Sequence, residues 1–182
     1  MNFRMRRVKE LKGAIALDMP YKGKRLSMIF LLPNDKHSSL ADLEDAMSKI
    51  TDLNSIFHKF HKFGRKSKVE VTLPRFKLES EFDLVEPLKQ LGMTDMFGSM
   101  ADFSGMTGGT NKGLYVSEAI QKAFVEVNEE GTEAAAATGI TIVGRSMSYT
   151  KQFTCDRPFM FLIRDNLTGM ILFSGHVTDP SK

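Results

Sequence analysis

Two unbroken apolar runs limit what this chain can fold into: residues 28–32 and residues 159–163. Each run has the length of a buried β-strand, and both fall far short of the roughly 18 apolar residues that a membrane-spanning helix requires. They therefore predict strands inside a hydrophobic core. No apolar run in the sequence is longer, so we expect no membrane partner.

The composition is that of one ordinary globular domain, or of part of a larger one. The chain has 182 residues, of which 42% are apolar and 26% are charged. A formal net charge of +3 is too small to imply a nucleic-acid partner. Cys155 is the single cysteine, which excludes an internal disulfide, and the four histidines are scattered. The sequence therefore predicts neither a metal nor a cofactor.

Alternating and periodic apolar patterns divide the chain into strands and helices. Strands are predicted at residues 14–17, 26–32, 69–73, 159–163 and 170–173, with weaker strand character between 114 and 127. A helix is predicted after the capping pair Ser39 and Asp42, a second one closes at Gly64, and a short third one ends at Gly92. Because strands and helices are segregated along the chain, the predicted fold class is α+β.

The segment between residues 129 and 146 allows two interpretations. Local propensity favours the start of a capped helix near Thr132. In an extended conformation, however, one face would carry only small, uncharged side chains: Thr132, Ala134, Ala136 and Thr138. Such a face could enter the middle of a sheet over a packed core without overfilling it. A segment that is exposed in one state and becomes a sheet strand in another needs this compromise.

In its motifs the chain resembles the serpin family. The motifs follow the family's order: residues 26–33 as its central B-sheet strand, 71–76 as its "LPKF" passage, 91–97 and 101–105 as its "LGM…F…ADFSG" stretch, and 156–163 and 171–175 as its closing strands. The resemblance covers essentially the whole chain. It implies a serpin fold, with several β-sheets and helices, and an inhibitor of serine proteases rather than an enzyme. Because serpins are much longer than this chain, we expect residues 1–182 to be the C-terminal portion and the N-terminal half to be absent.

The resemblance assigns residues 129–149 to a reactive loop, the bait that such an inhibitor offers to a protease. Its hinge would comprise Glu129, Glu130, Gly131, Thr132, Glu133, Ala134, Ala135, Ala136 and Ala137. The family's usual loop length, counted from Gly131, places the reactive bond between Arg145 and Ser146. Val143, Gly144 and Met147 would then face the protease subsites.

An arginine at the reactive bond suits a protease pocket with a carboxylate at its base, as in trypsin-like serine proteases. The run Gly144-Arg145-Ser146 also resembles the corresponding run of antithrombin. The resemblance implies a suicide mechanism, in which the protease forms an acyl-enzyme with the cut loop and the loop inserts as a strand into the A sheet.

Three other interpretations remain open at this point. Arg145 could be no more than a solvated loop charge. The protein could be a non-inhibitory serpin that acts as a carrier or chaperone, although the intact run of small hinge residues argues against this. The chain could also be a serpin fragment without activity of its own.

A basic group lies on and beyond the second predicted helix: Lys59, Lys62, Arg65, Lys66 and Lys68. Because some serpins bind heparin-like polyanions on a helix in this region, the resemblance suggests heparin or another glycosaminoglycan as a partner. Such binding would be mostly electrostatic and salt-dependent. The alternative is a solvated helix face, and the charges alone do not separate the two interpretations.

Asn166-Leu167-Thr168 is an N-glycosylation sequon in a predicted hairpin turn. It gives weak support to a secreted protein, and we expect an extracellular location. The basic start of the chain lacks a following apolar region, so it does not have the pattern of a signal peptide.

Overall fold

The computed structural model of the chain describes residues 2–34, 38–110, 113–128 and 150–179. The chain divides into two compact units, one formed by residues 1–76 and 128–182 and the other by residues 77–127. A seven-stranded sheet is the basis of the first unit, and a two-stranded sheet that of the second.

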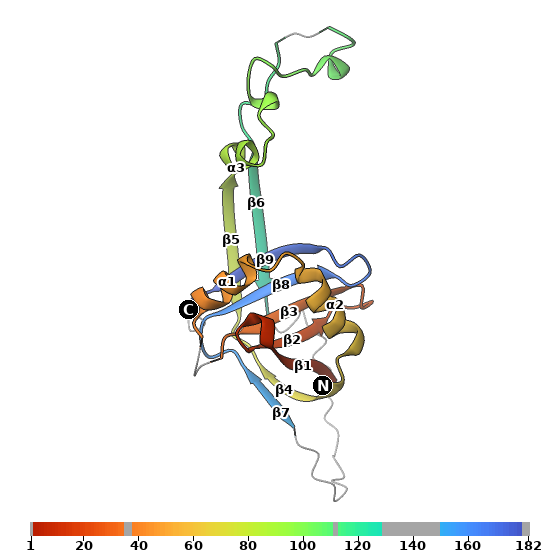
Figure 1. Ribbon diagram of the computed structural model, residues 1–182, viewed down its shortest axis with the longest axis vertical. Coiled ribbons are helices and arrows are strands. Elements are labelled where there is room, and N and C mark those ends of the chain that lie inside the picture. Colours follow the sequence, from red (N-terminus) through yellow and green to blue (C-terminus); the bar gives the residue numbers. More distant parts are fainter. Residues whose placement is uncertain (1, 35–37, 111–112, 129–149, 180–182) are drawn as a thin grey trace, which may run out of the picture. The chain divides into compact units, whose positions relative to one another are not determined.

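Seven strands form the sheet of the first unit, in the order β7-β4-β1-β2-β3-β8-β9 (Figure 1). They are β1 (Asn2–Val8), β2 (Ala14–Pro20), β3 (Leu26–Leu32), β4 (Lys66–Thr72), β7 (Lys151–Thr154), β8 (Phe159–Asp165) and β9 (Ile171–Val177). Neighbouring strands are antiparallel except β4 and β7, which run parallel. The two apolar runs of the sequence become β3 and β8, which pair with Phe30 opposite Phe161.

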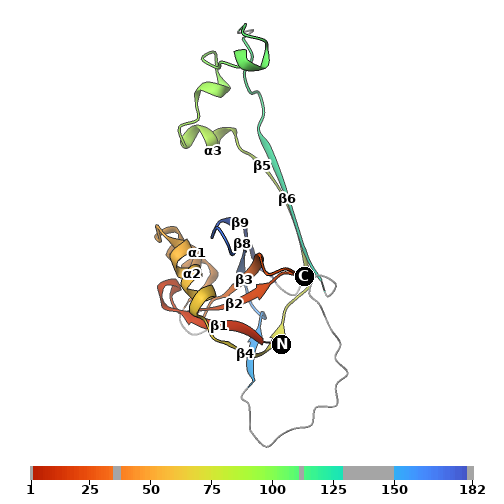
Figure 2. The ribbon, with the colours of Figure 1, turned by 90° about the vertical axis from the view of Figure 1, so that its right-hand side faces the viewer.

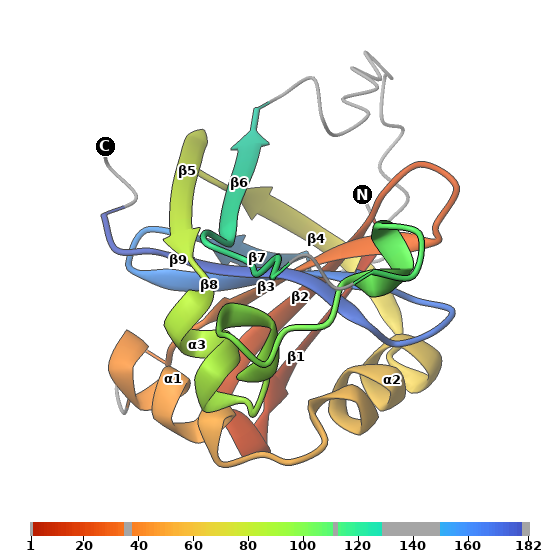
Figure 3. The same cartoon turned by 90° about the horizontal axis from the view of Figure 1, so that it is seen from above.

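Two helices, α1 (Leu40–Ser48) and α2 (Leu53–Phe63), cover one face of this sheet (Figure 3). Ser39 caps α1 as predicted, since its Oγ accepts a hydrogen bond from the Asp42 backbone N–H at 3.2 Å and its own N–H donates to the Asp42 carboxylate at 2.9 Å. Both helices and the sheet contribute buried side chains to one core: Val8, Leu11, Ala14, Ala16, Ile29, Leu31, Leu43, Ala46, Ile56, Phe57, Phe60, Met160 and Leu162.

A buried polar network also joins α2 to the sheet. Asp18 on β2 is 1% exposed, and its Oδ2 accepts a hydrogen bond from Arg4 Nη1 at 3.2 Å and lies 3.1 Å from His61 Nδ1 on α2. Arg164 on β8, also 1% exposed, donates from Nη2 to Asn54 Oδ1 of α2 at 2.7 Å. Burial lowers the pKa of Arg164, and nearby carboxylates oppose part of that shift. Because a buried charge is costly without its partner, this network holds α2 in place.

Aromatic side chains cover the opposite face of the sheet. The ring centroids of Phe30 and Phe159 are 5.9 Å apart, and Phe76 packs against Phe159 at 5.8 Å and Phe161 at 5.5 Å. Successive residues of a strand point to opposite faces, so β3 and β8 are buried on both. This explains why their sequences are unbroken apolar runs rather than alternating ones.

The second unit consists of a long pair of strands and a small helical region. β5 (Phe76–Asp83), which starts at the boundary of the two units, pairs with β6 (Ile120–Val127) (Figure 2). Lys122 Nζ lies 3.1 Å from the Glu81 carboxylate, and Lys77 Nζ lies 5.3 Å from the ring centroid of Phe124. These contacts link the two strands through their side chains.

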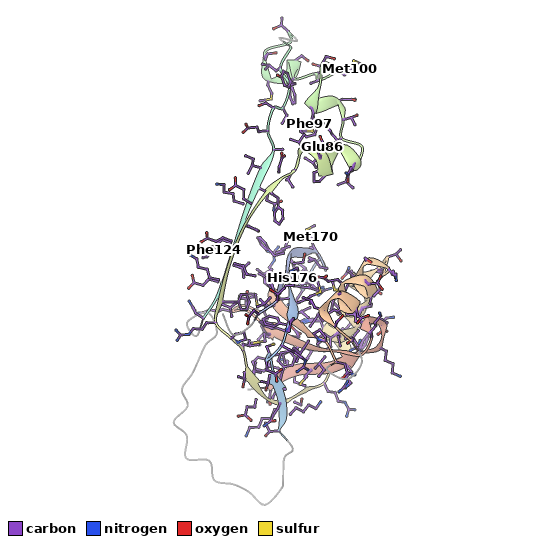
Figure 4. All side chains as sticks on the ribbon, turned by 90° about the vertical axis from the view of Figure 1, so that its left-hand side faces the viewer. Glu86, Phe97, Met100, Phe124, Met170 and His176 are labelled. Carbon is purple, nitrogen blue, oxygen red and sulfur yellow. The ribbon has the colours of Figure 1, made fainter. Side chains whose placement is uncertain are left out.

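The helical region begins with α3 (Val85–Gln90), which follows β5 and is closed by Gly92 at φ +92°, as the sequence predicts. Lys89 Nζ pairs with Glu86 at 2.8 Å and lies 6.0 Å from the ring centroid of Phe97; Figure 4 labels both partners. This unit exposes many large apolar side chains: Phe82, Leu91, Met93, Met100, Met106, Leu114, Tyr115, Ile120 and Phe124.

Candidate functional site

The candidate reactive loop, residues 129–149, connects a strand of one sheet to a strand of the other. It follows β6, which ends at Val127, and precedes β7, which begins at Lys151. The predicted reactive bond Arg145–Ser146 lies outside the described residues, as do the hinge residues 129–137 and the subsite residues Val143, Gly144 and Met147. The described part of the site is therefore the pair of strands at the two ends of the segment.

β7 anchors the C-terminal end of this segment at one edge of the seven-stranded sheet. It pairs with β4, with Lys151 opposite Val69 and Thr154 opposite Thr72. Phe153, in the middle of β7, is 1% exposed. The Cys155 N–H extends the pairing by donating to the Thr72 carbonyl oxygen at 3.0 Å. Although β7 has only four residues, backbone pairing and a fully buried aromatic ring hold it to the sheet.

Arg157 ties the chain beyond β7 to the end of β3. Its Nε donates a hydrogen bond to the Pro33 carbonyl oxygen at 3.2 Å, and its Nη1 pairs with the adjacent Asp156 at 2.7 Å. Sequence reasoning did not find this contact, because 124 positions separate Arg157 from Pro33 and a lone arginine carries no local signal of such a partner.

Cys155, between β7 and Arg157, is buried. Burial raises the pKa of its thiol to about 12, and the positive charge of Arg157 offsets only part of that effect. The thiolate is the nucleophilic form of cysteine, so this sulfur is unreactive at neutral pH.

β6 leads into the N-terminal end of the segment. Among the strands that the structure describes, β6 pairs with β5 alone, which leaves its other edge without a neighbour. Phe124 on this strand, labelled in Figure 4, is 54% exposed. Within the part of the chain that the structure describes, the segment thus starts from a strand at the edge of a two-stranded sheet.

The predicted basic residues lie on α2, on β4 and at the junction between them, and together they are called the basic surface. All five side chains are exposed: Lys59 and Lys62 on α2, Arg65 after it, and Lys66 and Lys68 on β4. The structure adds Arg6 of β1, whose guanidinium lies 5.5 Å from the centroid of the Phe60 ring. β1 reaches this surface because it pairs with β4. Over the described ranges, no carboxylate forms an ion pair with any of the five.

Asn166 lies in the hairpin turn between β8 and β9, and the structure confirms this turn. Its Nδ2 donates hydrogen bonds to the Lys24 carbonyl oxygen at 3.1 Å and to Ser27 Oγ at 2.8 Å. Its Oδ1 accepts one from Arg164 Nη1 at 3.3 Å. The sequon therefore lies in a surface turn, but the side chain of its asparagine is hydrogen-bonded to other parts of the fold.

The described residues contain no group of three or more histidine, cysteine, aspartate or glutamate side chains that could hold a metal ion. Within the same ranges, every helix is too short or too polar to span a membrane.

A family model described as Serpin (serine protease inhibitor) matches residues 1–180, which defines the class as one of protease inhibitors and not of enzymes. The chain belongs to the serpin family.

Three relatives illustrate the extent of the similarity. The chain is 45% identical over 170 residues to Serpin B3 of Homo sapiens, covering 92% of this chain and 42% of that protein. It is 42% identical over 178 residues to leukocyte elastase inhibitor of Bos taurus, covering 95% and 45%. It is 42% identical over 164 residues to neuroserpin of Gallus gallus, covering 90% and 38%. The chain thus spans less than half the length of these relatives.

The predicted α+β serpin fold is confirmed, as a partial fold with mixed sheets and few helices. Serine proteases are the target class that the family description prints. The reactive bond, the antithrombin-like detail of the loop, the glycosaminoglycan partner and the extracellular location stay predictions.

Proposed function

We propose that this chain provides the reactive loop of a suicide inhibitor of trypsin-like serine proteases, with Arg145–Ser146 as the bond offered for cleavage. The observation that supports this most directly is the position of residues 129–149, between a strand with one free edge and a strand anchored in another sheet. The small side chains of the hinge and the family match over residues 1–180 also support it.

The reaction proposed at the loop follows serine protease chemistry. The protease serine Oγ attacks the Arg145 carbonyl carbon and forms an ester, the bond to the Ser146 nitrogen breaks, and the protease histidine gives that nitrogen a proton. The Arg145 guanidinium would bind the carboxylate of a trypsin-like pocket. Gly144 has no side chain to keep the loop away from the protease cleft.

Cleavage would release the loop to insert. The hinge follows β6 directly, so an inserted strand that starts there would turn back along the free edge of β6. About ten new ladder hydrogen bonds at about 1 kcal/mol net each would supply roughly 10 kcal/mol. This is enough to displace protease groups whose placement matters within about 1 Å.

The anchor at β7 explains why the cut would act as a trigger. Before cleavage, the pairing with β4 and the burial of Phe153 hold the C-terminal end of the segment in the seven-stranded sheet. After cleavage only the hinge end remains attached to β6. The bond broken by the protease is therefore the restraint that prevents insertion.

The name of one relative, leukocyte elastase inhibitor, points to a competing target. An elastase has a small specificity pocket, which would accept Val143 better than Arg145. A carrier-like or inactive serpin fragment also remains an alternative. These cases differ in where the loop is cut and in whether a covalent complex forms.

The test incubates the chain with trypsin and, separately, with elastase, followed by denaturing electrophoresis and intact-mass analysis. A band with the summed mass of trypsin and residues 1–145 indicates an inhibitor, and a simple cut after Arg145 indicates a substrate or carrier. Arg145→Glu should abolish both trypsin products, whereas Lys22→Glu in the exposed β2–β3 turn should change neither. Cleavage by elastase after Val143, with no trypsin cut at Arg145, would replace the proposed reactive bond.

A second proposed function is binding of heparin or another glycosaminoglycan in an extracellular setting. Its support is the basic surface of Lys59, Lys62, Arg65, Lys66 and Lys68, which Arg6 extends onto β1. Elution from heparin resin above physiological salt is expected, because the attraction is electrostatic. Lys59→Ala with Lys62→Ala should lower the eluting salt concentration, and Lys22→Ala with Lys24→Ala should not. An equal decrease in the eluting salt concentration for both pairs of substitutions would show that the basic surface is a solvated face and not a specific heparin site.

A further inference from the structure

The Asn166 side chain cross-links two turns that are far apart in the sequence. Its Nδ2 donates to the Lys24 carbonyl oxygen, 142 positions earlier, and to Ser27 Oγ, 139 positions earlier. Its backbone N–H donates to the Arg25 carbonyl oxygen at 2.7 Å. With Oδ1 accepting from Arg164, every polar atom of the carboxamide has a partner. The β8–β9 turn is thereby fastened to the β2–β3 turn.

Two of the three residues that bond to this carboxamide are buried. Ser27 is fully buried, and Arg164 is 1% exposed and bonded to Asn54 at the start of α2. Gly169, in the same turn as Asn166, has φ +83° and is so close to Asn54 that even a Cβ would collide with it. The turn therefore packs tightly against α2 at Gly169.

Glycan transfer would require Asn166 Nδ2 to break hydrogen bonds that it makes in the fold. The reaction forms a bond from Nδ2 to the anomeric carbon of a lipid-linked sugar, breaks the bond from that carbon to a pyrophosphate oxygen, and removes one Nδ2 proton. The product amide keeps one N–H, so at least one of the two hydrogen bonds must be lost. The sugar would then compete for the space of the Lys24 carbonyl oxygen or of Ser27 Oγ, which lie 3.1 and 2.8 Å from Nδ2.

We infer that the Asn166 sequon is closed to glycosylation once the two turns have met, and that the carboxamide acts in the folded chain as a structural cross-link. The other two residues of the sequon, Leu167 and Thr168, are exposed, and by themselves they would suggest an accessible site. The acceptor nitrogen, by contrast, is engaged in two hydrogen bonds within the fold. A glycan could be added only to a chain in which the β8–β9 turn has not yet docked.

The test offers the purified, folded chain to an oligosaccharyltransferase with a lipid-linked oligosaccharide donor. Gly108→Asn supplies an internal reference, because it completes a sequon with the exposed Thr110 at a position where φ is +73° and nothing lies within 4 Å of a Cβ. Asparagine tolerates this backbone conformation. A synthetic peptide of residues 160–175 serves as the unfolded acceptor.

Mass spectrometry should find the peptide and the reference site glycosylated, and Asn166 of the folded chain glycosylated at least about tenfold less, because two hydrogen bonds must open together to free its nitrogen. Equal occupancy of Asn166 and the reference site in the same folded chain would overturn the inference.

A second measurement tests the cross-link without the enzyme. Asn166→Ala should lower the melting temperature by about 5–10 °C, because it removes the hydrogen-bond partner of Arg164 Nη1 and of the buried Ser27 Oγ, whereas Leu167→Ala, on an exposed side chain, should leave it unchanged. Asn166→Asp, which keeps the shape but loses both donors, should also lower it. Failure of Asn166→Ala to fold, with Leu167→Ala folding normally, supports the cross-link. An unchanged melting temperature in Asn166→Ala and Asn166→Asp would refute it.

Discussion

The ring of Phe161 fills the space that a side chain at Gly175 would occupy. The two residues are opposite each other on β8 and β9, and a Cβ at position 175 would lie 2.7 Å from Phe161 Cζ. The same ring packs against Phe76 with centroids 5.5 Å apart. Glycine in a strand often marks such a close approach, and here it lets an aromatic ring lie across the neighbouring strand.

Gly175→Ala should therefore lower the free energy of unfolding by about 1–3 kcal/mol, because the added methyl group overfills the space beside Phe161. Urea unfolding of the purified chain measures the change. Gly98→Ala is the matched control, since nothing lies within 4 Å of a Cβ there, and it should be neutral or slightly stabilising. Equal effects of the two substitutions would show that the ring does not restrict position 175.

Asp18→Asn should destabilise the chain by about 3–5 kcal/mol. The change removes the buried carboxylate that Arg4 and His61 contact, and it leaves those groups and the nearby Arg164 without its charge. Asp45→Asn removes one partner of the exposed Lys49–Asp45 pair and should cost less than about 0.5 kcal/mol. Thermal or urea unfolding of both variants checks the contrast, which would vanish if the Asp18 cluster behaved like a surface pair.

Cys155 should resist alkylation in the folded chain. Burial raises its thiol pKa to about 12, so at pH 8 almost no thiolate is present, and even at pH 10 the thiol remains mostly protonated. In the unfolded chain the pKa returns to about 8.5. Because the raised pKa favours the folded state only while the thiol is protonated, its contribution to stability should be lost as pH rises from about 9 to about 12. Iodoacetamide labelling followed by mass spectrometry, with and without urea, measures the reactivity; rapid labelling of the folded chain at pH 8 would contradict it.

Thr132→Arg should convert an inhibitor into a substrate when tested in a protein of the relatives' full length. The proposed insertion buries the side chain at position 132, and a charged guanidinium there would have to enter the sheet without a partner. The expected result is normal cleavage after Arg145 with loss of the covalent complex on a denaturing gel. Glu133→Arg, on the opposite face of the extended segment, should keep the complex. A complex that survives Thr132→Arg would exclude burial of that position.

Local patterns predicted most of the fold. The two apolar runs became β3 and β8, and Ser39, Gly64 and Gly92 mark the helix boundaries as expected. β1 was not predicted, because Arg4, Arg6 and Arg7 hide its strand character. Its place in the sheet depends on pairing with β2 and β4, and on the contact of Arg4 with the buried Asp18. Such pairings come from tertiary structure and leave no periodic signal in the sequence.

The reactive segment remains a prediction from the sequence, and the contacts of the strands that flank it could not be predicted. The small residues from Thr132 to Ala137 and the arginine that follows them indicated a bait loop. The parallel pairing of β7 with β4 and the Arg157–Pro33 contact, by contrast, join parts of the chain that only the folded sheet brings together. The engaged Asn166 carboxamide was equally invisible, because a sequon is recognised by three residues and says nothing about what the asparagine touches.

Strands that precede residues 129–149 in the sequence and strands that follow them are interleaved within the seven-stranded sheet: β7 lies beside β4, and β8 lies between β3 and β9. A nick at Arg145 would therefore cut the polypeptide into two without separating them. The short product that begins at Ser146 supplies three of the seven strands, so both pieces should co-elute as a single particle and part only in denaturant. A size-based assay under native conditions would miss the cleavage altogether.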